Sequence, residues 1–572
     1  MRSSYVMGFA LCIVSVVIML EAYDSPALGE ETAGRAITIF CSPSLDLSKL
    51  KAGNAPLIKG LGNLHFEIST RSKQAQRYFD QGLMLMYAFN HGESARSFLE
   101  VTRLDSSAAM GWWGMAMVLG PNYNAALNPS SLEEINKAMA NAKQHEWKAT
   151  AKEKWLINAL LKRYPAEPVS EMAPFHAAYA AAMKQAYEQF PQDADVATLY
   201  ADAMMNEHPW NLYSKDGKAQ PWTPGIEQVL EATMKRHPNH PGALHLYIHA
   251  VEASSTASRG LPAARKLLNL VPAAGHLVHM PAHIYIRTGH YHDGVQATEL
   301  AQVSDSSYIA QCKSQGTYPL LYYPHNIHFL AACAFLEGNS KKAMEAAWSV
   351  SRHADRRYLA TNGTVQHYYS IPFYVLVHLG KWEDILSIPA PGGSLQYPTA
   401  IWHYARGMAF TARGKWQEAT AELKKLKAYA GESSLRSLLI WETNSALDLI
   451  SIAALTLEAE MLAFGHQYDQ AIALLQQAVV IEDKLNYQEP PDWFFSVRHS
   501  LGHVLLQAKR FTEAEAVYRD DLKILPENGW ALMGLLKSLE GQERNADAEL
   551  VRQRFEKAWQ WADISLTSSR KY

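Results

Sequence analysis

Helical periodicity runs through nearly the whole chain and limits the fold more than any other feature of the sequence. Segments rich in Ala, Leu, Met and Gln alternate with short turns, whereas strand signals are nearly absent. At 572 residues, the chain is too long for one ordinary compact core. We therefore expect an all-α protein that is built either from several domains or as an elongated helical repeat.

Two segments share a pattern of small residues, an aromatic residue and, in one of them, a terminating proline. In Leu501–Leu536 the pattern residues are Gly502, Ala508, Phe511, Ala514, Ala516 and Pro526. In Tyr78–Ala116 they are Gly82, Ala95, Phe98, Ala109, Trp112 and Gly114. Both segments resemble tetratricopeptide repeats (TPRs), whose unit of about 34 residues forms two antiparallel helices. Weaker copies occur between them.

This resemblance covers most of residues 75–560 and implies an α-solenoid of TPR-like helix pairs. Its expected form is a right-handed superhelix with a concave inner face. TPR proteins generally bind peptides or partner proteins on that face. A Pro/Gly-rich stretch at Pro389–Pro398 predicts a division into an N-terminal solenoid at 61–390 and a C-terminal TPR solenoid at 391–572.

The N-terminus has the features of a secretory signal. Arg2 precedes an apolar run from Tyr5 to Leu20, which is shorter than the roughly 18–20 residues that a membrane span needs. We expect a signal peptide at 1–29, cleaved after Gly29, and an extended linker at 30–60. An uncleaved membrane anchor is the less favoured alternative. The mature protein is then expected to be periplasmic or secreted, without a transmembrane segment.

Charge and cysteine content exclude some classes of function. The net charge of −3 and the lack of a basic tract argue against nucleic acid as a partner. The four widely spaced cysteines do not form a disulfide framework. The sequence also contains no phosphate-binding glycine loop, nucleophile elbow or named metal motif.

Histidines gather in the middle of the chain, where 11 of the 23 lie between positions 237 and 328. His245 and His249 are four residues apart on a predicted helix and so share one face. His279 and His283 form a second such pair, and each follows its counterpart by 34 residues, which is one TPR period. Equivalent helices of successive repeats pack about 8–10 Å apart, so we expect the two pairs to meet. The solenoid then has a histidine-lined concave face.

A third pair extends the cluster onto the next predicted helix. The predicted metal ligands are His245, His249, His279, His283, His325 and His328, with Glu252 and His276 as ligands or supporting groups. Imidazole suits copper, zinc, nickel and iron. Copper is favoured over iron or zinc, because the set has no cysteine and the expected compartment is oxidising. This number of ligands fits either one metal ion or two. A polar groove without metal is the competing interpretation.

The predicted function is a periplasmic or secreted TPR metalloprotein. If the protein is an enzyme, we expect a metal-dependent oxidoreductase acting on a small molecule or peptide in the groove. The candidate catalytic residues are then Glu252, Glu207, Tyr247 and Tyr285. A non-catalytic scaffold for a peptide or an envelope protein, and a metal storage or delivery protein, are the alternatives.

Four histidine-containing segments are also similar to those of a subgroup of secreted bacterial TPR-containing proteins. They read AFNHGESARSF, ALHLYIHAVEAS, GHLVHMPAHIYIR and YYPHNIHFL. This similarity implies no particular activity. In the polar turn LGPNYN, Leu119–Asn124, we expect mainly a helix stop signal.

Overall fold

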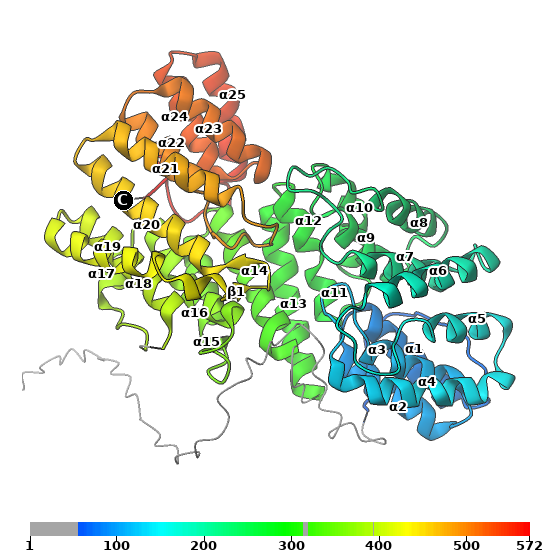
Figure 1. Cartoon of the computed structure of the whole chain (residues 1–572). Coiled ribbons are helices and arrows are strands. Elements are labelled where there is room, and N and C mark those ends of the chain that lie inside the picture. The colour runs from blue at the N-terminus through cyan, green and yellow to red at the C-terminus, as the bar shows by residue number, and fades with distance from the viewer. Residues whose placement is uncertain (1–54, 313–317, 393, 572) are drawn as a thin grey trace, which may run out of the picture. The chain divides into compact units, whose positions relative to one another are not determined.

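The computed structural model describes residues 55–312, 318–392 and 394–571. In these ranges, helices labelled α1 to α25 follow one another along the chain (Figure 1). Two strands of two residues each, β1 (Leu439–Ile440) and β2 (Asn444–Ser445), form an antiparallel hairpin. The prediction of an all-α fold is confirmed. The signal peptide at 1–29 and the linker up to residue 54 lie outside the described residues.

The helices fall into three groups along the chain. Residues up to 236 contain α1 (Lys73–Tyr87), α2 (His91–Leu104), α3 (Ala109–Leu119), α4 (Leu132–His145), α5 (Ala151–Leu160), α6 (Ala173–Gln189), α7 (Ala194–Glu207) and α8 (Thr223–Arg236). The central part of the chain contains α9 (Pro241–Val251), α10 (Leu261–Leu267), α11 (Gly275–His279), α12 (Pro281–Arg287), α13 (Tyr291–Cys312), α14 (Tyr323–Leu336), α15 (Ser340–His353), α16 (Gly363–His378) and α17 (Trp382–Ser387). The last third contains α18 (Gln396–Ala412), α19 (Trp416–Ala430), α20 (Ala446–Phe464), α21 (Tyr468–Glu482), α22 (Val497–Gln507), α23 (Phe511–Ile524), α24 (Gly529–Gly541) and α25 (Asn545–Ala558).

Helices that follow one another in the chain pack as pairs, and glycines let them approach closely. Phe98 of α2 lies between Gly82 of α1 and Gly114 of α3. A Cβ atom added at Gly82 would come within 2.8 Å of the Phe98 ring, and one added at Gly114 within 2.4 Å. These contacts identify the unit as a TPR-like helix pair, in which an aromatic ring fills the groove between helices.

The same arrangement recurs near the C-terminus. Tyr518 of α23 lies between Gly502 of α22 and Gly534 of α24, where an added Cβ would come within 2.3 and 2.1 Å of its ring. Phe511, the aromatic residue of the sequence pattern, packs instead against Gly541. The described residues therefore form a solenoid of TPR-like helix pairs, as the sequence predicts. Helices α16 and α18 also pack together across the segment 389–398, and the domain boundary at 390/391 stays a prediction.

The C-terminal repeats also contact the central ones. The Tyr291 hydroxyl donates to the carbonyl of Pro526 at 2.7 Å, and the Trp530 indole N–H donates to the carbonyl of Phe335 at 3.0 Å. Asp563 accepts hydrogen bonds from the backbone N–H groups of two residues at the start of α15. These contacts hold segments from the last third of the chain next to the histidine-bearing helices.

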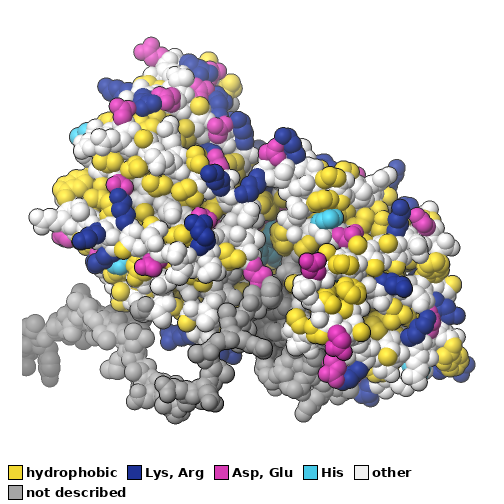
Figure 2. All heavy atoms as spheres, in the orientation of Figure 1, with side chains coloured by type: hydrophobic (Ala, Val, Ile, Leu, Met, Phe, Trp, Pro, Cys, Tyr) yellow, Lys and Arg dark blue, Asp and Glu magenta, His cyan; other side chains and the backbone are white. Residues whose placement is uncertain are grey.

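On the face shown in Figure 2, basic and acidic side chains are interspersed. None of the described helices has the length and apolar character that a membrane crossing requires.

The close approach at Gly114 predicts a specific loss of stability. Gly114→Ala should lower the free energy of unfolding by about 1–3 kcal/mol, because the added methyl group overlaps the buried Phe98 ring. Gly225→Ala in α8 is the matched control, since nothing lies within 4 Å of its added Cβ. It should leave stability unchanged or slightly raised. Urea denaturation followed by circular dichroism measures both, and equal effects of the two substitutions would contradict the packing described.

Candidate metal centre

The two predicted histidine pairs lie on equivalent helices. His245 and His249 belong to α9, and after the intervening helix α10 the chain continues into α11 and α12, which carry His279 and His283. The ring centroids of His249 and His283 are 6.1 Å apart. The one-period spacing in the sequence therefore corresponds to side chains that meet in space.

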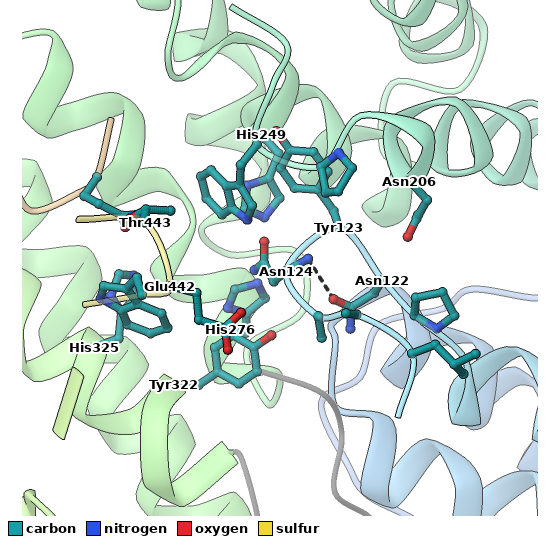
Figure 3. A pocket seen from close by; sticks show the side chains of 18 of the residues that line it. Asn122, Tyr123, Asn124, Asn206, His249, His276, Tyr322, His325, Glu442 and Thr443 are labelled. Carbon is teal, nitrogen blue, oxygen red and sulfur yellow. Dashed lines mark hydrogen bonds between the residues drawn. The ribbon is translucent and has the colours of Figure 1, made fainter. Parts of the chain in front are cut away.

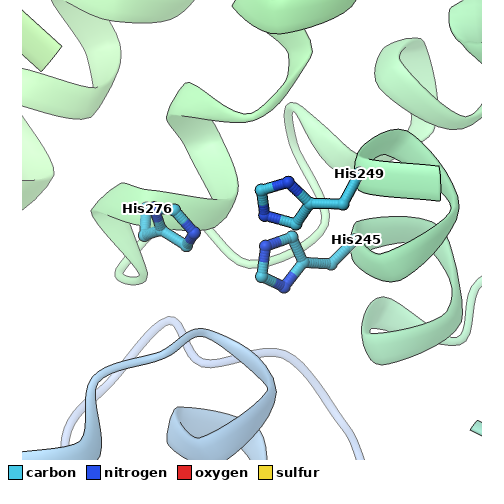
Figure 4. A group of neighbouring side chains, drawn as sticks. All are labelled: His245, His249 and His276. Atoms are coloured by element: carbon cyan, nitrogen blue, oxygen red, sulfur yellow. The ribbon is translucent and has the colours of Figure 1, made fainter. Parts of the chain in front are cut away.

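The first of three candidate metal-binding groups among the described residues consists of His245, His249 and His276 (Figure 4). One ring nitrogen from each lies within 4.8 Å of the others, and all three side chains are buried. The Nε2 atoms of all three have no hydrogen-bond partner within the described part of the chain. Unpaired buried polar atoms are costly, so three of them on neighbouring rings require an explanation.

The opposite nitrogens of two of these rings are held by protein acceptors. His245 donates from Nδ1 to the carbonyl of Tyr87 at 2.6 Å, and His249 donates from Nδ1 to Glu252 Oε1 at 2.8 Å. In a neutral ring, such a hydrogen bond places the single proton on Nδ1 and leaves the lone pair of Nε2 free. Metal-binding histidines are typically oriented in this way by an outer acceptor.

The second group consists of His279, His283 and His325, again with ring nitrogens within 4.8 Å of one another. The Nε2 atoms of His279 and His283 are 3.1 Å apart. At this distance the two nitrogens either share one proton or both face a common cation. His325 comes from the first turn of α14, and its Nδ1 has no hydrogen-bond partner among the described residues.

Glu252 joins the two groups and also belongs to a third. Its side chain is 1% exposed, and its second oxygen lies 2.7 Å from His283 Nδ1. Glu489 Oε2 lies 3.1 Å from the same nitrogen, so that Glu252, His283 and Glu489 form the third group. Burial alone would raise the pKa of Glu252, but the nearby His283 and His249 lower it below the usual range. The carboxylate is thus ionised where it is needed as an acceptor.

Burial controls the charge of the histidine rings. It holds the pKa of His245, His276 and His279 well below the usual range, with further lowering by neighbouring imidazoles. These rings are neutral at neutral pH, which is the form that binds a metal ion. His283 differs, because the Glu252 and Glu489 carboxylates outweigh burial and raise its pKa. Phe89 contributes to this burial, since its ring centroid lies 4.6 Å from that of His245.

A pocket of about 400 Å³ opens onto both groups (Figure 3). His249 and His276 of the first group line it, together with His283 and His325 of the second. The remaining wall comes mainly from three separate parts of the chain: residues 121–127 after α3, the 441–443 turn of the hairpin, and residues 488–489. A metal ion held by three histidines would keep a coordination position available to a molecule in this pocket.

Several predicted residues lie elsewhere. His328 is outside the three groups, 5.5 Å from the ring of His367 and stacked 5.0 Å from that of Phe494. Tyr247 donates to Glu231 at 2.8 Å, and Tyr285 is buried in the apolar core.

Glu207, at the end of α7, is not among the residues that line the pocket. Of the four catalytic candidates, only Glu252 therefore lies within a metal-binding group.

Several residues that complete the pocket were not predicted from the sequence. Asn122, Tyr123 and Asn124 form part of the wall, although their turn reads as a helix stop. The two asparagines in this turn are the feature of the sequence that could have indicated a pocket wall. Trp441 and Glu489 had no signal, because no spacing rule links the last third of the chain to helices more than 100 residues earlier.

Comparison with known proteins identifies no family. No family model and no curated protein matches the sequence. Among solved structures, a human IFIT1 dimer with m7Gppp-AAAA matches with a TM-score of 0.32 and 11% identity, over 84% of this chain and 95% of that one. Yeast Tom70 matches with a TM-score of 0.28 and 12% identity, over 85% and 91%. At these values the matches say nothing about function, and the fold assignment rests on the helix pairs themselves.

The buried His367 ring predicts a pH dependence of the metal-free protein. Burial lowers its pKa to about 3, whereas an unfolded histidine titrates near 6.5. Between these values only the unfolded chain takes up the proton. The stability contributed by the neutral ring is therefore present above pH 6.5 and is lost as the pH falls toward 3.

His367→Gln should make the loss of unfolding free energy between pH 6 and 4.5 less steep, by about 1.4 kcal/mol per pH unit. His466→Gln is the control and should leave the slope unchanged, because that ring is exposed. Denaturation at several pH values after chelator treatment measures the slopes. An unchanged slope for His367→Gln would mean that this ring is protonated in the folded protein.

Proposed function

We propose that this protein is a metalloprotein in which each of the two three-histidine groups holds one transition-metal ion. The observation that carries the proposal is the close approach of ring nitrogens from three buried histidines in the first group, each of which also has an Nε2 atom without a hydrogen-bond partner among the described residues. In His245 and His249, a hydrogen bond at Nδ1 orients the ring so that Nε2 can bind a metal ion. A bound cation would satisfy all three nitrogens at once, at metal–nitrogen distances of about 2.0–2.1 Å.

Copper is the metal we favour over zinc or iron. Both groups offer only imidazole nitrogens, and Glu252 is already engaged as the acceptor of His249 Nδ1. Imidazole-dominated sites suit copper, although they also accept zinc and iron. We further propose that the chain is exported to the periplasm or secreted, since the apolar N-terminal run reads as a signal peptide.

The chemistry that the metal would supply is oxidation of a small molecule in the adjoining pocket. The protein's own contribution is to hold His245, His276 and His279 neutral, to orient His245 and His249 through Tyr87 and Glu252, and to admit a molecule beside His249 and His276. A scaffold that binds a peptide or envelope protein, or a storage protein, would use the same helix pairs. A scaffold would show no metal, and a storage protein would bind metal without oxidising any substrate.

Metal content tests the proposal directly. After chelation, reloading with copper and desalting, we expect about two ions per chain by elemental analysis. The variants His245→Ala/His276→Ala and His279→Ala/His325→Ala should each hold about one, since each removes one group. His466→Ala, at an exposed position, should hold two. Less than about 0.1 ion per chain in the reloaded native protein would reject metal binding.

The role of Glu252 predicts a change in affinity. Glu252→Gln removes the charge that holds His249 and His283, so copper affinity should fall about 10- to 100-fold in competition with a chelator of known affinity. Glu422→Gln is the matched control, because Glu422 is also a buried carboxylate that accepts from a histidine, His403, but outside the three groups. It should leave affinity unchanged. Equal losses in the two variants would assign the effect to general stability.

A further inference from the structure

We propose that the pocket beside the histidine groups binds an aromatic ring that carries hydroxyl or amine donors and no negative charge. This inference rests on the proposed function for its biological meaning, since the pocket opens onto the candidate metal ligands. The geometry that supports it, however, consists of the walls of the pocket and is independent of any metal.

Aromatic side chains line the pocket from different directions. The ring centroids of Tyr123 and Trp210 are 5.1 Å apart, and the Trp210 ring meets that of His249 edge-on at 5.8 Å. Trp441, from the hairpin turn, lies 5.3 Å from His325, and Tyr322 lies 5.1 Å from His276. Each group of histidines therefore has an indole beside it at the pocket wall. Indole faces suit a planar ring, which they bind by offset or edge-to-face stacking.

Both indoles are held in a backbone conformation that bulky residues rarely adopt. Trp210 has φ 57° and Trp441 has φ 49°, and Glu442, which also lines the pocket, has φ 60°. The left-handed region is unfavourable for residues with a Cβ, and such strain is concentrated at functional sites. The backbone N–H of Trp441 donates to Thr364 at 2.8 Å, which fixes the turn. The fold thus maintains two unfavourable conformations that place indoles at this pocket.

The polar groups of the pocket wall indicate which substituents a bound aromatic ring carries. None of the described residues that line the pocket is lysine or arginine, and the His283 imidazole, whose pKa is raised, is already paired with Glu252 and Glu489. Glu442 adds a further carboxylate to the wall, which disfavours an anion. The buried Oδ1 of Asn124 has no hydrogen-bond partner among the described residues and can only accept, so a ligand with an O–H or N–H donor would satisfy it.

Apolar side chains decide between an aromatic compound and a sugar. Pro121, Leu127 and Met172 line the pocket together with the two tryptophans. Hydroxyl groups on the face of a sugar that lies against these side chains would have no hydrogen-bond partner there, which is costly. An aromatic ring with one or two donors leaves few polar groups to satisfy.

The test compares three probes by isothermal titration calorimetry: p-cresol, p-toluate and glucose. Chelator-treated protein and copper-loaded protein are titrated separately, so that failure of metal binding leaves the first titration valid. We expect metal-free protein to bind p-cresol at least tenfold more tightly than p-toluate, which differs in carrying a carboxylate. Glucose should not bind measurably. Tighter binding of p-toluate or of glucose would overturn the proposal.

Substitutions locate the binding. Trp210→Ala and Trp441→Ala should each weaken p-cresol binding about threefold to tenfold, the loss expected for one stacking partner. Trp416→Ala is the matched control, since Trp416 is 43% exposed, close to the 41% of Trp210, and does not line the pocket. It should have no effect. Unchanged affinity in both pocket variants, with circular dichroism showing native folding, would exclude this pocket as the site.

Discussion

The arrangement of the histidines depends on one buried carboxylate. Glu252 accepts from His249 Nδ1 with one oxygen and lies 2.7 Å from His283 Nδ1 with the other. A carboxylate 1% exposed is tolerated only when it is paired and hydrogen-bonded. Its partners are the second histidine of each repeated pair, so one carboxylate contacts both groups and orients the His249 ring by a hydrogen bond. Replacing His249 or His283 would leave the buried charge of Glu252 without one of its partners. The charges of the two groups therefore depend on one another.

The fold brings these groups together through helix pairing at close range and through contacts at long range. Glycines at 82, 114, 502 and 534 permit close packing of successive helices. The repetition of such helix pairs is what converts a sequence period into a spatial cluster. The contacts of Tyr291 and Trp530 then hold the last repeats beside the central ones. The hydrogen bond from the backbone N–H of Trp441 to Thr364 fixes the hairpin turn beside them.

The sequence predicts the positions of residues that follow the helical repeat. It does not predict the positions that depend on contacts between distant repeats. The all-α fold, the helix pairs and the meeting of His249 with His283 follow from helical periodicity and from the 34-residue spacing. His328 shows the limit of this reasoning, because a spacing of three residues on α14 does not direct both rings to one point. Trp441 and Glu489 could not be predicted, since their positions depend on tertiary contacts between distant repeats. Asn124 could not be assigned because a polar turn has the same composition whether it ends a helix or lines a pocket.

The dispersed origin of the pocket wall has a consequence for biosynthesis. Ribosomes deliver the chain from its N-terminus, so α9 to α14 emerge and can pair before residues 441–443 and 488–489 exist. The histidines then stand together for a period without their indole and carboxylate neighbours from the last third. If the pocket binds the proposed ligand, its selectivity is acquired only when the final repeats dock. Any reactive capacity of the centre is expected to appear late, as a property of the completed chain.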